Sequence, residues 1–251
     1  MKIFSDPGKI KHELSRCNDK EIGFVPTMGA LHKGHISLIN KSIAENNITI
    51  VSIFVNPTQF NDPEDLKKYP GNTDNDIRIL EPLNVDYLFA PEHNLLYNDN
   101  YLYRINETIF SKELCGAQRE GHFEGVLTVV MKLLNIVNSH RAYFGEKDFQ
   151  QYKLIKGMAE AFFMNVEIVL SPTIRENDGL ALSSRNLLLS VENRKKAAKF
   201  PELLMSGQSD KEVNSQLEKE GFKVDYIKTL NGRRFGAVVL GKIRLIDNVK
   251  K

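Results

Sequence analysis

The order of short β-branched runs and amphipathic stretches along residues 21–170 constrains the fold more than any other feature of this chain. Apolar runs typical of strands occupy residues 22–25, 48–55, 85–89, 141–144 and 166–170. Residues 35–46 and 124–138 repeat apolar side chains at helical spacings. Residues 73–80 begin with a capping-box-like pair, Thr73 and Asp76, which also predicts a helix. A further helix is predicted over residues 149–162. Alternating strands and helices predict an α/β fold, a Rossmann-like doubly wound parallel sheet of five strands.

The sequence changes character after Leu189, which predicts a second, smaller α+β domain at the C-terminal end. Helices are expected over residues 192–204 and 211–220, and short strands over 224–229, 237–240 and 244–246. A chain of 251 residues is long enough for one to two domains at ~150 residues each. We therefore predict a Rossmann-like domain over residues 1–189 and an α+β domain over residues 190–251.

Composition excludes several classes of protein. The formal charge is only +2 and no long run of one sign occurs, which argues against a nucleic-acid-binding tail or a polybasic membrane anchor. The two cysteines, Cys17 and Cys115, form no CxxC or Cys/His cluster, as in proteins of a reducing compartment. No secretory signal and no apolar run of ~18 residues occurs. We expect a cytoplasmic protein that binds neither nucleic acid nor membrane.

Polar segments follow four of the predicted strands, and ligands of doubly wound sheets bind at the carboxyl ends of strands. The first segment, PTMGALHKGH, runs from Pro26 to His35 and leads into a helix. Its backbone N–H groups at the helix start suit a phosphate, and His32 and His35 suit oxygens that gain charge. The alternative is one capping histidine and one surface histidine, but two histidines flanking Gly34 favour function. His12 and His93 are expected to be surface residues.

The other three segments add amides, charges and hydroxyls. NPTQF offers Asn56 and Gln59, although such residues also form ordinary turns. FGEKDFQQ offers Lys147, Asp148 and Gln151, with a solvated charge cluster as the equal alternative. LSSRN, from Leu182 to Asn186, offers two hydroxyls and Arg185, with a helix cap as its alternative. Together these loops contain no thiol nucleophile, metal cage, hydrolase triad or GxGxxG motif, so they indicate phosphate handling rather than hydride transfer.

These segments, in this order, resemble the pantothenate synthetase (pantoate–β-alanine ligase) family of the HxGH nucleotidyltransferase superfamily. The resemblance spans residues 22–186 through the four segments and CGAQREGHFEGVLTVVMKLL, with weaker similarity in VDYIKTL and IRLIDN. It implies an ATP-dependent ligase that condenses (R)-pantoate with β-alanine through a pantoyl adenylate, releasing pyrophosphate and AMP. It also implies Mg²⁺ and a homodimer. The alternatives are another HxGH nucleotidylyltransferase and a catalytically silent ATP-binding module.

The resemblance also implies roles for individual residues. His35, His32, Lys147 and Arg185 would be catalytic, and Gln59, Gln151, Asn56 and Arg119 would bind substrate. Asp74 and Asp76 would approach magnesium through water. ATP would be bound by Met28, Gly29, Ala30, Leu31, His32, Lys33, Gly34, His35, Gly145, Glu146, Lys147, Asp148, Ile174, Leu182, Ser183, Ser184 and Arg185.

Two features depart from the family pattern. Leu182 stands where the family commonly has Met, a nearly volume-conserving change of small expected cost. The C-terminal domain, residues 190–251, is expected to be shorter than usual for the family. Because that domain would act as a lid, a shorter one would affect closure over the adenylate rather than the first chemical step.

Overall fold

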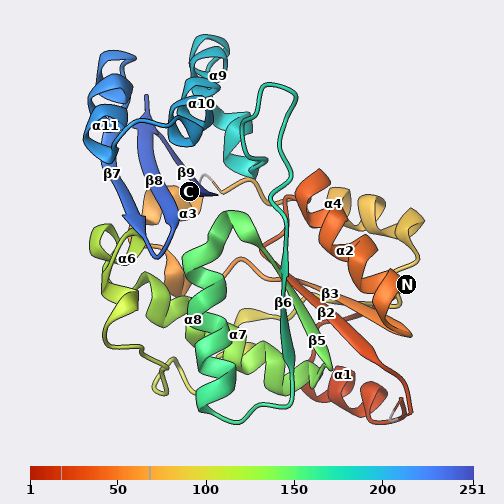
Figure 1. The fold of residues 1–251 in the computed structure, drawn as a ribbon. Helices are drawn as coiled ribbons and strands as arrows, with labels where there is room; N and C mark the ends of the chain where they lie inside the picture. Colours follow the sequence, from red (N-terminus) through yellow and green to blue (C-terminus); the bar gives the residue numbers. More distant parts are fainter. Residues whose placement is uncertain (18, 68) are drawn as a thin grey trace.

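A parallel sheet with helices on both faces forms the larger part of the computed structural model, which describes residues 1–17, 19–67 and 69–251 (Figure 1). The strand order is β1-β4-β3-β2-β5-β6, and every pair is parallel. The chain moves outward from β2 through β3 to β4 and then returns to β5 on the other side. The sheet therefore has a topological switch point between β2 and β5, where such folds bind ligands. The strands are β1 (Lys2–Phe4), β2 (Ile22–Thr27), β3 (Ile48–Ile53), β4 (Tyr87–Phe89), β5 (Arg141–Gly145) and β6 (Glu167–Ser171).

Successive residues of each strand point to opposite faces of this sheet, and each face has its own core. Phe24, Ile50 and Phe144 pack with α1, α7 and α8, whereas their neighbours Val25 and Val51 pack with α2 and α4. Both sides of the sheet are apolar, as expected for strands covered on both faces. The helices of this part are α1 (Pro7–Leu14), α2 (Lys33–Glu45), α3 (Pro63–Lys67), α4 (Thr73–Leu80), α5 (His93–Leu96), α6 (Cys115–Gln118), α7 (His122–Val137) and α8 (Phe149–Ala161), with short 3-10 turns η1 (Pro57–Gln59), η2 (Glu81–Leu83), η3 (Phe110–Lys112), η4 (Glu146–Asp148) and η5 (Ser184–Leu188).

The predicted α/β fold class is confirmed, and the structure corrects three details. The sheet has a sixth strand, β1, which at three residues is too short to give a periodic signal. Helix α4 spans residues 73–80 as predicted, but Asn72 rather than Thr73 caps it, by accepting the Asn75 N–H at 3.0 Å. The predicted helix over residues 192–204 is two helices, because Pro201 has no N–H to donate to the preceding turn.

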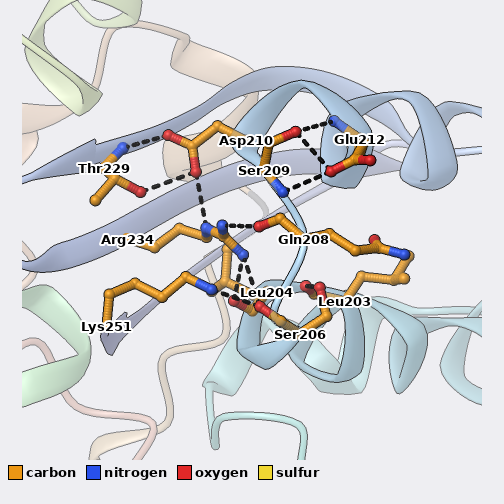
Figure 2. Close-up of polar contacts among 10 residues, drawn as sticks. All are labelled: Leu203, Leu204, Ser206, Gln208, Ser209, Asp210, Glu212, Thr229, Arg234 and Lys251. Atoms are coloured by element: carbon orange, nitrogen blue, oxygen red, sulfur yellow. Dashed lines mark hydrogen bonds and ion pairs between the residues drawn. The ribbon is translucent and has the colours of Figure 1, made fainter.

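The C-terminal part is an antiparallel sheet, β7-β8-β9, covered by helices on one side (Figure 1). Its elements are α9 (Val191–Ala197), α10 (Lys199–Met205), α11 (Asp210–Lys219), β7 (Lys223–Leu230), β8 (Arg233–Leu240) and β9 (Ile243–Lys250). Its core extends back to Leu180, so the boundary proposed at residue 189 stays a prediction. Figure 2 shows Arg234 at the junction of α10, α11 and β8, where it donates to Asp210 at 2.8 Å and to the carbonyls of Leu204 and Ser206.

Candidate active site

The loop after β2 is held in shape by a carboxylate from α4. Asp76 is 1% exposed and accepts the backbone N–H groups of Ala30 at 2.9 Å and Leu31 at 2.8 Å. Gly29, at φ +74°, precedes them, and a Cβ there would lie 2.6 Å from the Asp76 carboxylate. Glycine at this position therefore permits both the turn and the approach of Asp76.

The two histidines of this loop cap the start of α2 together. The Gly34 N–H donates to His32 Nδ1 at 3.1 Å, and the His32 N–H donates to His35 Nδ1 at 3.3 Å. Each Nδ1 is thus an acceptor, so each neutral ring carries its proton on Nε2. A Cβ on Gly34 would come within 2.8 Å of the His32 ring, which explains the glycine between them. Both histidines thus take part in the helix cap, and both rings also line a cavity, so their functional role stays a prediction.

Burial keeps both imidazoles neutral. It lowers the pKa of His32 to about 4, and the positive charge of Lys147 acts in the same direction. It lowers the pKa of His35 to about 3, assisted by His32 and Lys147. Two neutral N–H donors therefore stand side by side, with ring centroids 4.1 Å apart. Such donors suit oxygens on which negative charge develops.

A cavity of about 240 Å³ at the switch point joins most of the predicted site residues. The loops after β2, β5 and β6 contribute to one wall, and the start of α7 contributes apolar side chains to another. The ATP-site residues that line the cavity are Met28, His32, Gly34, His35, Gly145, Lys147, Asp148, Ile174, Leu182, Ser183, Ser184 and Arg185. Those outside its lining are Gly29, Ala30, Leu31, Lys33 and Glu146.

Three neutral amides predicted to bind substrate, Asn56, Gln59 and Gln151, line the same cavity. We call them the acid pocket, after the carboxylic acid that they would bind. Asn56 and Gln59 are buried, and the Asn56 side-chain amide donates to Gln59 Oε1 at 3.1 Å. The Gln59 amide in turn donates to Met28 Sδ at 3.0 Å, and Gln151 completes the polar lining. Its neighbour Gln150 points elsewhere and accepts the Cys115 N–H at 3.1 Å. Of the two adjacent glutamines, Gln151 therefore lines this cavity and Gln150 does not.

The cationic residues are placed around this cavity in different ways. Arg185 forms an ion pair with Asp65 of α3 at 2.9 Å. Lys147 lies 3.7 Å from Asp148 and is 19% exposed. Arg119 lines a second cavity of about 990 Å³, between the parallel sheet and the C-terminal part. The two cavities adjoin, because both are lined by Met28, Gln59, Lys147, Asp148, Gln151, Ser183 and Arg185.

The C-terminal sheet holds the η4 loop of this site. The Asn248 side-chain amide donates to the carbonyls of Glu146 and Lys147 at 2.8 and 2.9 Å. Glu146 is paired with Arg233 at 2.7 Å, which explains why its side chain does not face the first cavity. Asp247 of β9 also binds Arg175 through two hydrogen bonds of 2.6 and 3.0 Å. The bonds from Asn248 and Arg233 therefore attach Glu146 and Lys147 of η4 to the C-terminal sheet.

The predicted magnesium carboxylates do not form a metal cage. Asp76 uses both oxygens on the loop after β2, and Asp74 is exposed on α4. Within the described parts of the chain, no group of three or more His, Cys, Asp or Glu side chains is arranged to hold a metal ion. A role for Asp74 or Asp76 near magnesium stays a prediction.

Sequence reasoning missed His122, the first residue of α7. It is 8% exposed, donates from Nδ1 to the Gln59 carbonyl at 2.9 Å and contacts Arg119 through Nε2 at 3.0 Å. The apolar periodicity of residues 124–138 predicts only a core-facing helix. The available signal was the three-residue spacing of Arg119 and His122 just before that helix.

The switch-point cavity, the paired histidines and the neighbouring cations define a class of nucleotide-handling α/β enzymes with an HxGH loop. The family model described as pantoate-beta-alanine ligase matches residues 2–250. The chain therefore belongs to the pantoate–β-alanine ligase family, as the resemblance predicted. None of its helices, over the ranges that the structure describes, has the length and apolar character needed to span a membrane.

Similar proteins cover nearly the whole chain. It is 54% identical over 229 residues to the pantothenate synthetase of Bdellovibrio bacteriovorus, covering 91% of each chain. It is 47% identical over 249 residues to that of Legionella pneumophila, covering 99% of each. The crystal structure of a Francisella tularensis pantoate–β-alanine ligase, complexed with β-γ ATP and β-alanine, superposes with a TM-score of 0.95 at 45% identity, covering 100% of this chain and 97% of that one.

One expectation about the C-terminal domain stays a prediction. The alignments cover 99% of the Legionella relative and 97% of the Francisella chain, so this chain as a whole is about as long as these two. These coverages concern whole chains, so a C-terminal domain over residues 190–251 that is short for the family, and its effect on lid closure, stay predictions.

Proposed function

We propose that this protein is an ATP-dependent ligase that condenses (R)-pantoate with β-alanine. In the first step a pantoate carboxylate oxygen bonds to the α-phosphorus of ATP, the bond between the α-phosphorus and the bridging oxygen breaks, and pyrophosphate leaves. In the second step the β-alanine amine bonds to the acyl carbon, the acyl–oxygen bond breaks, AMP leaves and the amine loses a proton. The products are pantothenate, AMP and pyrophosphate.

One observation carries this proposal: a single cavity is lined by neutral imidazole donors, by cations and by neutral amides. The imidazoles and cations suit a triphosphate. The amides of Asn56, Gln59 and Gln151 suit a carboxylate that has to remain nucleophilic, because a bidentate arginine would stabilise the ground state of the acid. An acceptor bearing a phosphate, as in related nucleotidylyltransferases, would require cations there.

We assign the catalytic roles to the histidines and cations as the family resemblance implies. His35 and His32 donate from Nε2 to the phosphate oxygens as pyrophosphate departs. Lys147 and Arg185 spread negative charge over the same group, and Arg185 exchanges Asp65 for phosphate when ATP binds. The reaction requires little covalent help, so alignment and charge stabilisation supply the rate.

Nucleotide binding is assigned to the remaining loop residues. Gly145 and Asp148 hold the ribose, the backbone of Ile174 contacts adenine, and Ser183 and Ser184 close on the triphosphate. Leu182 donates its backbone N–H to the Ile174 carbonyl at 3.0 Å, so its side chain can vary without changing that strand-like contact. Gly29, Ala30, Leu31, Lys33 and Glu146 act through the shape of the loops that carry the lining residues.

Magnesium, dimerisation and location complete the proposal. Mg²⁺ commonly binds through one or two carboxylates, substrate phosphates and water. We assign it to the ATP substrate, with Asp74 and Asp76 reaching it through water at most. A homodimer in the cytoplasm, acting on small molecules and not on nucleic acid or membrane, follows from the family resemblance and the composition.

The test is exchange of labelled pyrophosphate into ATP. We expect exchange that requires pantoate but not β-alanine, because only the ligase completes its first step with the acid alone. His35→Ala should lower the exchange rate by about 10²- to 10³-fold while ATP still binds. His12→Ala, on the exposed face of α1, serves as the matched control. Exchange without pantoate, or undiminished exchange in His35→Ala, would contradict the proposal.

A further inference from the structure

Arg119 is a half-buried cation whose hydrogen-bond partners are neutral. Its guanidinium donates to His122 Nε2 at 3.0 Å and to the Gln59 carbonyl at 3.2 Å. No carboxylate oxygen of residues 1–17, 19–67 or 69–251 forms an ion pair with it. Burial and the charges of Arg185 and Arg244 lower the pKa of Arg119 to about 10, so it stays protonated at neutral pH. A desolvated cation of this kind is stabilised by a bound anion.

His122 holds Arg119 and Gln59 together through its two ring nitrogens. The Gln59 carbonyl can only accept, so the proton lies on Nδ1, which is 2.9 Å away. A guanidinium can only donate, so Nε2 accepts from Arg119. Burial, together with the Arg119 charge, lowers the pKa of His122 to about 3, which keeps the ring in this neutral form.

The first turn of α7 packs closely against η1, the turn that carries Gln59. The Asn56 side-chain amide donates to the Gly125 carbonyl at 3.1 Å. A Cβ on Gly125 would lie 2.5 Å from the Thr58 carbonyl oxygen and 2.8 Å from the Gln59 nitrogen. Gln59 therefore has its side chain in the acid pocket and its carbonyl on the His122–Arg119 pair.

Three arginines face the larger cavity, and two of them already have carboxylate partners. Arg185 pairs with Asp65 at 2.9 Å, and Arg244 pairs with Asp225 at 2.8 Å. Arg119 is the remaining arginine of the three, and it donates to the carbonyl of Gln59, one of the residues that line both cavities. Its location fits an anion that must stay close to the acid pocket without entering it.

We propose that Arg119 binds the carboxylate of the amine-bearing substrate, and that His122 is the positioning residue that aims this guanidinium and fixes Gln59. The inference rests on the proposed ligation, whose second step requires a zwitterionic amino acid. Holding its carboxylate in the larger cavity leaves the amine free to reach the acyl carbon. A guanidinium is suited to this because it presents two parallel N–H groups to a carboxylate.

The first test compares β-alanine with β-alaninamide, which has the amine but no carboxylate. In the wild type kcat/KM should favour β-alanine, and Arg119→Met should reduce that preference by about 10- to 100-fold. Pantoate-dependent pyrophosphate exchange, which uses no amine, should fall by a smaller factor than the β-alanine preference. Arg104→Met is the matched control, because Arg104 pairs with Glu124 on α7 outside both cavities. An unchanged preference in Arg119→Met overturns the proposal.

The second test separates the two bonds of His122. Asn places an amide N–H near Nδ1, so His122→Asn keeps the Gln59 bond and should raise the KM for β-alanine alone. Gln places an oxygen near Nε2, so His122→Gln keeps the Arg119 bond and should raise the KM for pantoate in the exchange assay. Identical effects of both variants on both KM values would indicate a merely structural histidine and overturn the positioning role.

Two further outcomes show which anion Arg119 binds and whether the proposed reaction occurs at all. If Arg119→Met weakens product inhibition by pyrophosphate and leaves the β-alanine preference intact, the bound anion is pyrophosphate and the proposal fails. If the wild type shows no pantoate-dependent exchange, the proposed function itself fails. Should the His122 variants not fold, Arg119→Met and the two amines still decide the question.

Discussion

Arg234 and Arg119 are both withdrawn from solvent, yet their surroundings differ in kind. Arg234 is 3% exposed at its side chain and is surrounded by the Asp210 carboxylate and the carbonyls of Leu204, Ser206 and Gln208 (Figure 2). Arg119 has two neutral acceptors and faces a cavity. The first guanidinium has its charge and donors satisfied within the fold, whereas the second has its charge unpaired. For this pair of arginines, the partners therefore distinguish a cation satisfied within the fold from one that can still accept an anion.

The same contrast holds for the regions around these residues. In the C-terminal part, Asp210 also accepts the Thr229 N–H and hydroxyl at 2.7 and 2.8 Å, so the network is complete without a ligand. At the switch point, His32 and His35 use one ring nitrogen each and keep the other for the cavity. The difference predicts that mutations in the first region cost stability and those in the second cost catalysis.

The largest expected effect is the loss of stability when Arg234 is replaced. Arg234→Met should lower the free energy of unfolding by about 3 kcal/mol, since it removes the ion pair to Asp210 and the donor to three backbone carbonyls. Asp210 is 31% exposed, which keeps the loss at the lower end for buried pairs. Denaturant unfolding measures it, and turnover per folded molecule should stay near wild type.

Arg119→Met is the counterpart of this variant and should retain stability while losing the preference for β-alanine. Arg194→Met removes two partly exposed ion pairs, to Asp178 and Glu176, and controls for the loss of one positive charge. Equal stability losses in Arg234→Met and Arg119→Met would contradict the comparison.

A second effect comes from the neutral histidines. Burial lowers the folded-state pKa of His32 to about 4 and that of His35 and His122 to about 3, below the usual 6.5 of the unfolded chain. The unfolded state therefore binds more protons below pH 6.5, and stability is present above that pH and falls as the pH falls through about 4 to 3. Each histidine contributes up to about 1.4 kcal/mol per pH unit.

Unfolding free energies measured at several pH values between 7 and 4 check this effect. His122→Asn should flatten the slope by about one proton, because the variant lacks the titrating ring. Parallel slopes for the wild type and the variant would rule out a neutral buried His122.

The smallest expected effect concerns Asp65, whose ion pair with Arg185 competes with the binding of ATP. Asp65→Asn removes the ion pair and a negative charge beside the triphosphate site, so ATP affinity should rise by about two- to fivefold. Glu64→Gln, on the same helix, removes an equal charge that faces Lys67 and is the control. Calorimetric titration with ATP measures both, and weaker binding in Asp65→Asn would show that the carboxylate assists ATP.

The sequence predicted the fold class because periodicity and strand order are local signals. The same reasoning placed His32, His35, Lys147 and Arg185 correctly around one cavity, since the carboxyl ends of parallel strands meet at one edge. It missed β1, which at three residues carries too little pattern.

Contacts between distant segments could not be predicted in this way. Asp76 suggested a helix cap and a magnesium contact, but it lies against Ala30 and Leu31, 46 and 45 residues away. His122 begins a helix whose apolar residues indicate only a core position, and its partner Gln59 lies 63 residues earlier. Such contacts depend on how the elements are brought together, which periodicity does not encode.

The bonds from Asn248 and Arg233 to the η4 loop matter when the protein is divided into two fragments. A fragment ending near residue 189 would retain every lining residue of the smaller cavity, yet lack the donors that orient Glu146 and Lys147. Expressed separately, the two fragments should regain ligation only when mixed. That property would make the pair a split reporter whose signal depends on reassembly.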